Sequence, residues 1–168
     1  MSTYKDLCKI YDEARKEYFD AFNECAKILG EFFNGFCKRL DVTANSGVLG
    51  LVPDKQNYQE GLDYKPQGAI HLDADGYWHS CLVLKLTPHA ELNTEPAEVI
   101  SFLLRLKKRN NQMTLLIGDC EEEFIFENEQ FNDIYDYVDQ FIKEFYSSRL
   151  NSFLEKETKT RKIGFKLG

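Results

Sequence analysis

Two histidines and two aspartates lie close together in the sequence between residues 71 and 79. His71 and Asp73 are separated by one residue, so they would share one face of a strand, with His79 facing them across a hairpin. Imidazole nitrogens and carboxylate oxygens are common ligands of zinc and related ions in proteins. One hypothesis for this chain is therefore a small metal-dependent hydrolase that uses His71, Asp73 and His79.

A tight turn accounts for the same residues without a metal. Asp75 and Gly76 form a dipeptide that favours a β-hairpin turn, where polar neighbours are common. A calcium loop fits less well, because His71 stands at the position of the first carboxylate and Leu82 at that of the bidentate glutamate. We therefore expect no cofactor and no metal, and keep His71, Asp73 and His79 as weak candidate ligands.

Other residue patterns make no better case for catalysis. His79 and Cys81 alternate onto one strand face, but a Cys–His nucleophile also needs an orienting group and a pocket. The acidic run at 119–123 is more commonly a solvated loop than a cation site. Phosphate-binding loops and the serine-hydrolase and zinc-protease motifs are absent from the sequence. We expect no catalytic residues.

Basic residues gather in two places, at 105–109 and in the tail at 156–168, although the chain as a whole carries a net charge of −7. A nucleic-acid-binding accessory protein that uses this hairpin tip and tail is a second alternative. Phosphate contacts dominate nucleic-acid affinity, so the acidic remainder of the chain opposes this function. We expect no nucleic-acid partner.

The composition is that of one folded domain with an aromatic core. The chain has 168 residues, 43% of them hydrophobic, with 13 Phe and 9 Tyr. We assign residues 1–157 to a single domain and 158–168 to a basic C-terminal tail. No apolar run is long enough for a membrane span, and the first residues are unlike a secretory signal. Five cysteines without a C-x-x-C pair indicate reduced thiols and a cytoplasmic protein.

The elements that must position these residues begin with a long helix over 4–39. Its apolar residues alternate at spacings of four and three, which is the heptad pattern of helix pairs: Leu7, Tyr11, Ala14, Tyr18, Ala21, Cys25, Ile28 and Phe32. Such a helix is ~50 Å long at 1.5 Å per residue, whereas a compact chain of this size is about 40 Å across. The helix must therefore bend, pair with another helix, or project.

A second long helix is predicted from about 128 to 156, packed antiparallel to the first. Residues 41–68 form an irregular connection in which Val48–Val52 could be a short strand. The remaining strands are predicted at Ala69–Asp73, Tyr77–Leu86, Val99–Lys107, Met113–Ile117 and Glu123–Glu127. Short connections favour antiparallel neighbours, so the predicted fold is α+β, with an antiparallel meander of four to five strands between two long helices.

The leading functional hypothesis is a non-catalytic protein–protein interaction module, such as an adaptor, an immunity or inhibitor protein, or a regulatory subunit of a bacterial-type system. We expect a protein partner. One possibility is a homodimer, in which the partner is a second copy of the chain, bound through the N-terminal helix. The candidate interaction residues are Tyr11, Tyr18, Phe32, Phe33, Phe36, Tyr58, Tyr64, Arg161, Lys162 and Phe165.

Overall fold

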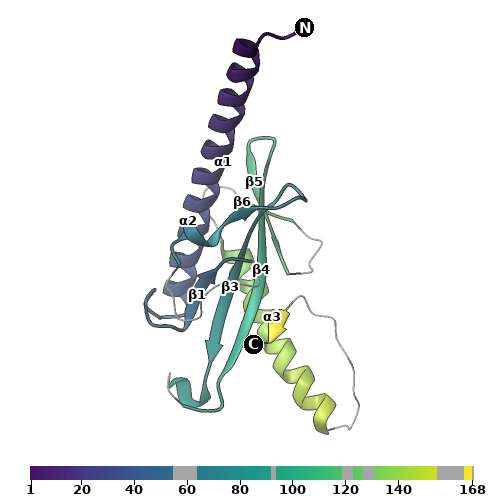
Figure 1. The fold of residues 1–168 in the computed structure, drawn as a ribbon. Coiled ribbons are helices and arrows are strands. Elements are labelled where there is room, and N and C mark those ends of the chain that lie inside the picture. The colour runs from purple at the N-terminus through teal and green to yellow at the C-terminus, as the bar shows by residue number, and fades with distance from the viewer. Residues whose placement is uncertain (55–63, 92–93, 119–122, 127–130, 155–164, 168) are drawn as a thin grey trace.

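The structure is a computed structural model that describes residues 1–54, 64–91, 94–118, 123–126, 131–154 and 165–167. Its elements in chain order are α1 (Tyr4–Arg39), β1 (Leu49–Val52), α2 (Pro66–Ala69), β2 (His71–Leu72), β3 (Trp78–Leu86), the 3-10 turn η1 (Pro88–Ala90), β4 (Glu98–Arg109), β5 (Gln112–Ile117), β6 (Phe124–Phe126), α3 (Asn132–Leu154) and β7 (Phe165–Leu167). The predicted α+β class is confirmed, with a helix at each end of an antiparallel sheet (Figure 1).

α1 begins with a capping box formed by Thr3 and Asp6. The Thr3 hydroxyl accepts a hydrogen bond from the backbone N–H of Asp6 at 3.2 Å, and the Asp6 carboxylate accepts one from the backbone N–H of Thr3 at 2.9 Å. These two bonds satisfy donors that a helix start leaves open. Lys38 and Arg39 lie in the last turn, where positive charge complements the helix dipole.

The sheet is built around the long β3–β4 hairpin. The strand order is β1-β3-β4-β5-β6, every pair is antiparallel, and β2 pairs with β3 while β7 pairs with β4. The meander is therefore confirmed for β3 to β6. β1 lies outside it, because it pairs with β3 from the opposite edge to β4, next to β2.

One face of this sheet forms the core with the two helices. The register places Trp78 opposite Leu106, and Leu82 opposite Phe102, and all four side chains are buried. The C-terminal half of α1 and the start of α3 cover this face with buried side chains from Cys25, Ala26, Leu29, Phe32, Phe36, Ile134, Tyr135 and Val138. Burial of so many aromatic and aliphatic groups supplies the main folding free energy.

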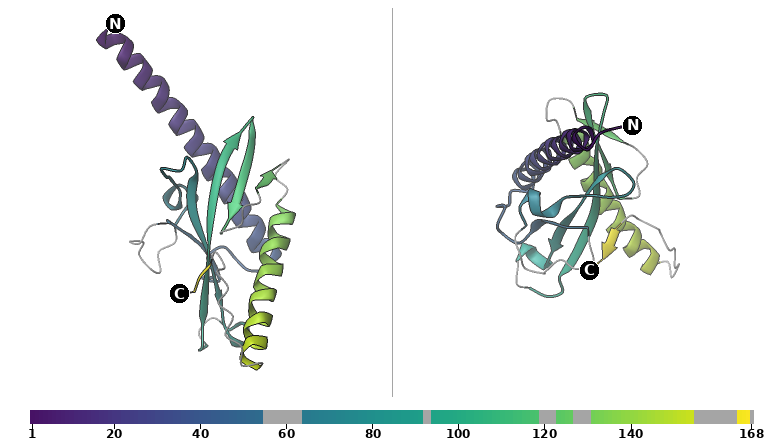
Figure 2. Two further views of the ribbon diagram at one scale, coloured as in Figure 1. Left: turned by 90° about the vertical axis from the view of Figure 1, so that its right-hand side faces the viewer. Right: turned by 45° about the horizontal axis from the view of Figure 1, so that its top comes forward.

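The two helices meet only at one end, which corrects the expected antiparallel packing along their lengths. The last turns of α1 contact the first turns of α3, where Arg39 pairs with Asp136. Away from this contact, the earlier part of α1 packs on Trp78. α3 runs instead toward the start of β4, where Tyr146 donates a hydrogen bond to the Glu98 carboxylate. Figures 1 and 2 show the two helices diverging. The sheet is long enough to give each helix its own part of the core face.

The N-terminal part of α1 projects beyond the sheet. All of residues 1–20 are exposed, and the first buried residue of the helix is Cys25. The views of Figures 1 and 2 show this part of the helix reaching past the β4–β5 hairpin. Of the three outcomes expected for so long a helix, projection is the one observed. None of the helices in the described ranges is both long and apolar enough to cross a membrane.

Candidate functional site

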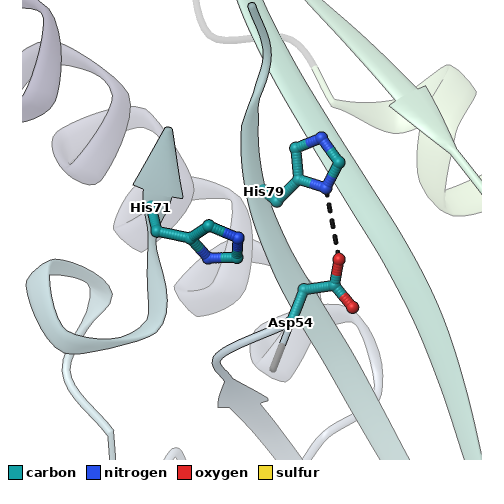
Figure 3. Close-up of side chains that lie close together, drawn as sticks. All are labelled: Asp54, His71 and His79. Atoms are coloured by element: carbon teal, nitrogen blue, oxygen red, sulfur yellow. Dashed lines mark hydrogen bonds and ion pairs between the residues drawn. The ribbon is translucent and has the colours of Figure 1, made fainter. Parts of the chain in front are cut away.

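The histidines and aspartates predicted from the sequence gather on the sheet face opposite the helices. β1 leaves the sheet after Val52, which pairs with Cys81, and β2 takes over the same edge of β3, where His71 pairs with His79. Asp54 follows β1 directly. Three separate segments therefore bring the side chains of Asp54, His71 and His79 together (Figure 3).

His79 is at the centre of this cluster and has carboxylates at both ring nitrogens. Its side chain is only 8% exposed. Nε2 lies 2.8 Å from a carboxylate oxygen of Asp75, and Nδ1 lies 3.2 Å from one of Asp54 and 3.7 Å from one of Asp73. An imidazole nitrogen donates a hydrogen bond only when it carries a proton, and a neutral ring carries one proton.

The hairpin turn holds Asp75 in place beneath the ring. The backbone N–H groups of Gly76 and Asp73 bond to the carbonyls of Asp73 and Tyr77, each at 3.0 Å, and Gly76 has φ of +81°. The predicted Asp-Gly turn is thus confirmed. Burial acts to raise the pKa of Asp75, but hydrogen bonds from the Tyr77 N–H and from His79 outweigh it. The net pKa of Asp75 is lowered, so the group is a carboxylate at neutral pH.

Asp54 is the member of the cluster that sequence reasoning missed. His71 and His79 come together as the sequence predicts, with ring centroids 5.7 Å apart. One ligand atom each of Asp54, His71 and His79 lie within 4.8 Å of one another. Asp73, which was the expected carboxylate, lies at the edge of the cluster with a side chain 47% exposed. Asp54 is found only through the pairing of β1 with β3, which no local pattern specifies.

Cys81 contributes to the same face by orienting Asp54. Its thiol donates a long 3.8 Å hydrogen bond to the second carboxylate oxygen of Asp54. The side chain of Asp54 is therefore held between His79 on one oxygen and Cys81 on the other. Sulfhydryl donors are weak, so this contact steers the carboxylate more than it stabilises it.

The basic residues of β4 lie farther along this face, packed around one aromatic ring. The charged groups of Arg105, Lys107 and Arg109 lie 5.9, 5.0 and 5.9 Å from the centroid of the Tyr77 ring. Arg109 also pairs with Glu123 at 3.4 Å. These cation–π and ionic contacts use the basic hairpin within the molecule, which gives it a structural role independent of nucleic acid.

The second feature with functional potential is the apolar seam of α1. Tyr4, Leu7, Ile10 and Tyr11 are 83%, 55%, 58% and 67% exposed. The seam becomes covered at Tyr18, whose ring packs 5.3 Å from that of Trp78. The N-terminal quarter of the heptad pattern thus has no counterpart among the described elements of the chain.

The remaining predicted interaction residues fall in different places. Phe32 and Phe36 are each 2% exposed and belong to the core, where they offer no surface to a partner. Phe33 and Tyr64 are half-buried against that core. Phe165 lies in β7, which pairs with β4. Tyr58, Arg161 and Lys162 lie outside the residues that the structure describes.

Comparisons of the chain with protein-family models, with curated proteins and with solved structures found no match.

Proposed function

We propose that this chain is a non-catalytic interaction module that pairs with a second copy of itself through the projecting part of α1, residues 4–20. The exposed seam of Tyr4, Leu7 and Tyr11 on an otherwise unsupported helix is the observation that carries the proposal. A heptad pattern of this kind is the sequence form of helices that pack by knobs into holes.

Stability supports a partner on this part of the helix. In proteins most helical stability comes from packing of an apolar face, whereas all of residues 4–20 are exposed in the single chain. Burying a large apolar side chain contributes ~1.5–3 kcal/mol. Two copies of a seam with Leu7, Ile10 and Tyr11 would bury six such side chains between them. Ala14 leaves room for close approach of the two helices.

Charge favours a second copy over a strongly charged partner. Residues 4–20 are nearly balanced in charge, with four basic groups (Lys5, Lys9, Arg15 and Lys16) against five acidic ones (Asp6, Asp12, Glu13, Glu17 and Asp20). The whole chain has a net charge of −7, so two copies repel one another over most of their surface. The projecting helix, with a net charge of only −1, is the part that can approach its own copy with little of that repulsion.

Sedimentation equilibrium of the full chain from low to high micromolar concentration tests the proposal. We expect the measured mass to rise to that of two chains. The double variant Leu7→Lys/Tyr11→Glu places opposite charges on the seam at constant net charge, and we expect it to remain a single chain over the same range.

A matched control exchanges charges on the outer side of the same helix. Lys9 and Glu13 form an exposed i,i+4 pair with 3.9 Å between Lys Nζ and the Glu oxygen. The double variant Lys9→Glu/Glu13→Lys keeps the net charge and the seam, and we expect it to dimerise as the parent does. A parent that has the mass of one chain at high micromolar concentration overturns the proposal, as does a seam variant that dimerises equally well.

A further inference from the structure

We propose that Asp54, His71 and His79 form a binding site for a divalent transition-metal ion of the zinc class. The three side chains reach the same point from the end of β1, from β2 and from β3, and one ligand atom of each lies within 4.8 Å of the others (Figure 3). This site is on the sheet face opposite the helices and is independent of pairing through α1.

The environment of His79 is that of a metal-bound histidine. Metal-binding histidines usually donate their second ring N–H to a carboxylate, which fixes the tautomer and the ring orientation. Asp75 fills this role, with an oxygen 2.8 Å from Nε2. This contact favours the tautomer with the proton on Nε2, in which the lone pair of Nδ1 points toward Asp54 and the side of the cluster where His71 lies.

A cation between these groups resolves an electrostatic conflict. With its proton on Nε2, the ring presents the Nδ1 lone pair to carboxylate oxygens of Asp54 at 3.2 Å and of Asp73 at 3.7 Å. Acceptors that face one another repel, and a shared positive ion converts this repulsion into attraction. A second proton on His79 would also remove the conflict. The metal titration described below distinguishes these two alternatives.

The donor set selects the class of ion. Two imidazole nitrogens and one carboxylate oxygen suit zinc and its neighbours, whereas Ca²⁺ and Mg²⁺ take oxygen ligands. Bonds of 2.0–2.2 Å in a tetrahedral site place ligand atoms about 3.4 Å apart, so the widest separation in the cluster must shrink by up to about 1.4 Å. Asp54 lies two residues beyond Val52, the last paired residue of β1, and its side chain is 27% exposed.

Three protein ligands leave the fourth coordination position of a tetrahedral ion open to another ligand. Asp73 is the described carboxylate best placed to reach it, since its oxygen lies 3.7 Å from His79 Nδ1. Water is the other ligand for that position, and three protein ligands with one water is the arrangement of catalytic zinc sites. The carboxylates of Asp54, Asp73 and Asp75 give the cluster the negative charge that attracts a cation.

Titration with Co²⁺ tests the site, because this ion replaces zinc and absorbs visible light. The full chain is reduced, stripped with a chelator and titrated with CoCl₂, followed by competition with ZnCl₂. We expect one Co²⁺ per chain with the spectrum of nitrogen and oxygen ligands, and displacement by one equivalent of Zn²⁺. We expect a large excess of MgCl₂ or CaCl₂ to displace none.

Single substitutions assign the ligands. We expect His71→Gln and Asp54→Asn each to weaken Zn²⁺ binding by more than the ~10–100-fold that loss of an outer partner such as Asp75 typically costs. His89→Gln is the matched control, since His89 is exposed on η1, and we expect it to bind as the parent does. We also expect no thiolate-to-metal charge-transfer band in the parent, which separates this site from adventitious thiolate sites. Circular dichroism of each variant establishes that it is folded.

Two results overturn the proposal. One is a parent chain that binds no Co²⁺ at a stoichiometric level. The other is binding that survives in folded His71→Gln, or that is lost equally in His89→Gln. A thiolate charge-transfer band in the Co²⁺-loaded parent also counts against it.

Discussion

The hydroxyl group of Tyr135 lies where the side chain of any larger residue at Gly35 would begin. A residue with a Cβ at position 35 would therefore clash with Tyr135. This hydroxyl donates a 2.8 Å hydrogen bond to the carbonyl of Phe32, and the Tyr135 ring stacks on Phe36 with centroids 5.0 Å apart. Burial raises the pKa of Tyr135 to about 12, so the hydroxyl keeps the proton that it donates. One tyrosine of α3 thereby holds the two helices together.

Gly35→Ala should destabilise the protein although alanine is the better helix former. The added methyl group would run into the Tyr135 hydroxyl, and overpacking of this kind costs ~1–3 kcal/mol. The gain in helix propensity offsets only about 1 kcal/mol. Urea denaturation of the parent and the variant measures the difference in free energy of unfolding.

The double variant Gly35→Ala/Tyr135→Phe identifies the cause. Tyr135→Phe alone should cost ~0.5–1.5 kcal/mol, because it removes the hydrogen bond to Phe32. It also removes the oxygen that opposes the new methyl group. The double variant should therefore be more stable than the sum of the two single effects implies. Strictly additive effects would show that the two groups do not meet.

Acid should weaken the attachment of α3 to the start of β4. Tyr146 and Arg149 both donate hydrogen bonds to the Glu98 carboxylate. The bond from Tyr146 is the largest cause that lowers the pKa of Glu98, burial acts against it, and Arg149 lowers it further. Because the pKa of Glu98 is lower in the folded state than its ordinary value of 4.5, the ionised group stabilises the fold at pH values above 4.5. This contribution is lost as the pH falls through the folded-state pKa.

Tyr146→Phe should accordingly reduce the free energy of unfolding more at pH 7 than at a pH below the folded-state pKa of Glu98, where this group is protonated in both states. Tyr4→Phe serves as the control, because Tyr4 is 83% exposed at the free end of α1. Its effect should be small and the same at both pH values. Chemical denaturation at a series of pH values measures both, and a Tyr146→Phe effect that does not change with pH contradicts the assignment.

Removing the cap of α1 should act locally. Thr3→Ala deletes the hydroxyl that accepts the Asp6 N–H, which typically costs a helix about 1 kcal/mol. Residues 1–20 are exposed, so this loss should speed amide hydrogen exchange in the first turns and leave the urea midpoint of the monomer unchanged. Mass spectrometry of peptic peptides measures this exchange and distinguishes a local effect on the first turns from a global loss of stability. Thr43→Ala serves as a control outside the helix.

The cysteines of α1 should differ sharply in reactivity. Cys25 is 2% exposed, and burial raises its pKa to about 12, so few thiolates form at neutral pH. Cys8 is exposed on the projecting helix. Iodoacetamide should therefore modify Cys8 in the native chain and spare Cys25 until urea unfolds it, as peptide mapping would show. Equal modification of both in the native state would contradict the packing of Cys25.

The parts of the fold that were predictable from sequence are those that local chemistry specifies. The apolar spacing over 4–39 predicted α1 with its observed bounds, and the predicted strands Tyr77–Leu86 and Val99–Lys107 match β3 and β4 to within two residues at each end. The Asp-Gly turn gave the hairpin that brings His71 to His79. Each of these depends on residues close in sequence, which explains why a pattern was enough.

The features that escaped prediction depend on contacts between distant segments. Asp54 joins His79 through strand pairing 25 residues apart in sequence. The course of α3 away from α1 depends on Glu98, which Tyr146 reaches across 48 residues. Phe32 and Phe36 looked available for a partner until Tyr135 was found packed on them. Hydrophobic spacing predicts that a helix face is covered. Only the tertiary structure shows which residues cover it.

Both glycines of α1, Gly30 and Gly35, lie in its anchored half, and the helix is unbroken from Tyr4 to Arg39. The projecting half contains neither of the residues, glycine and proline, that most readily bend a helix. It is therefore a stiff arm and not a tether. A partner that binds the N-terminal end of α1 therefore also fixes the orientation of the sheet and its histidine cluster relative to that partner. No change of fold is needed for this.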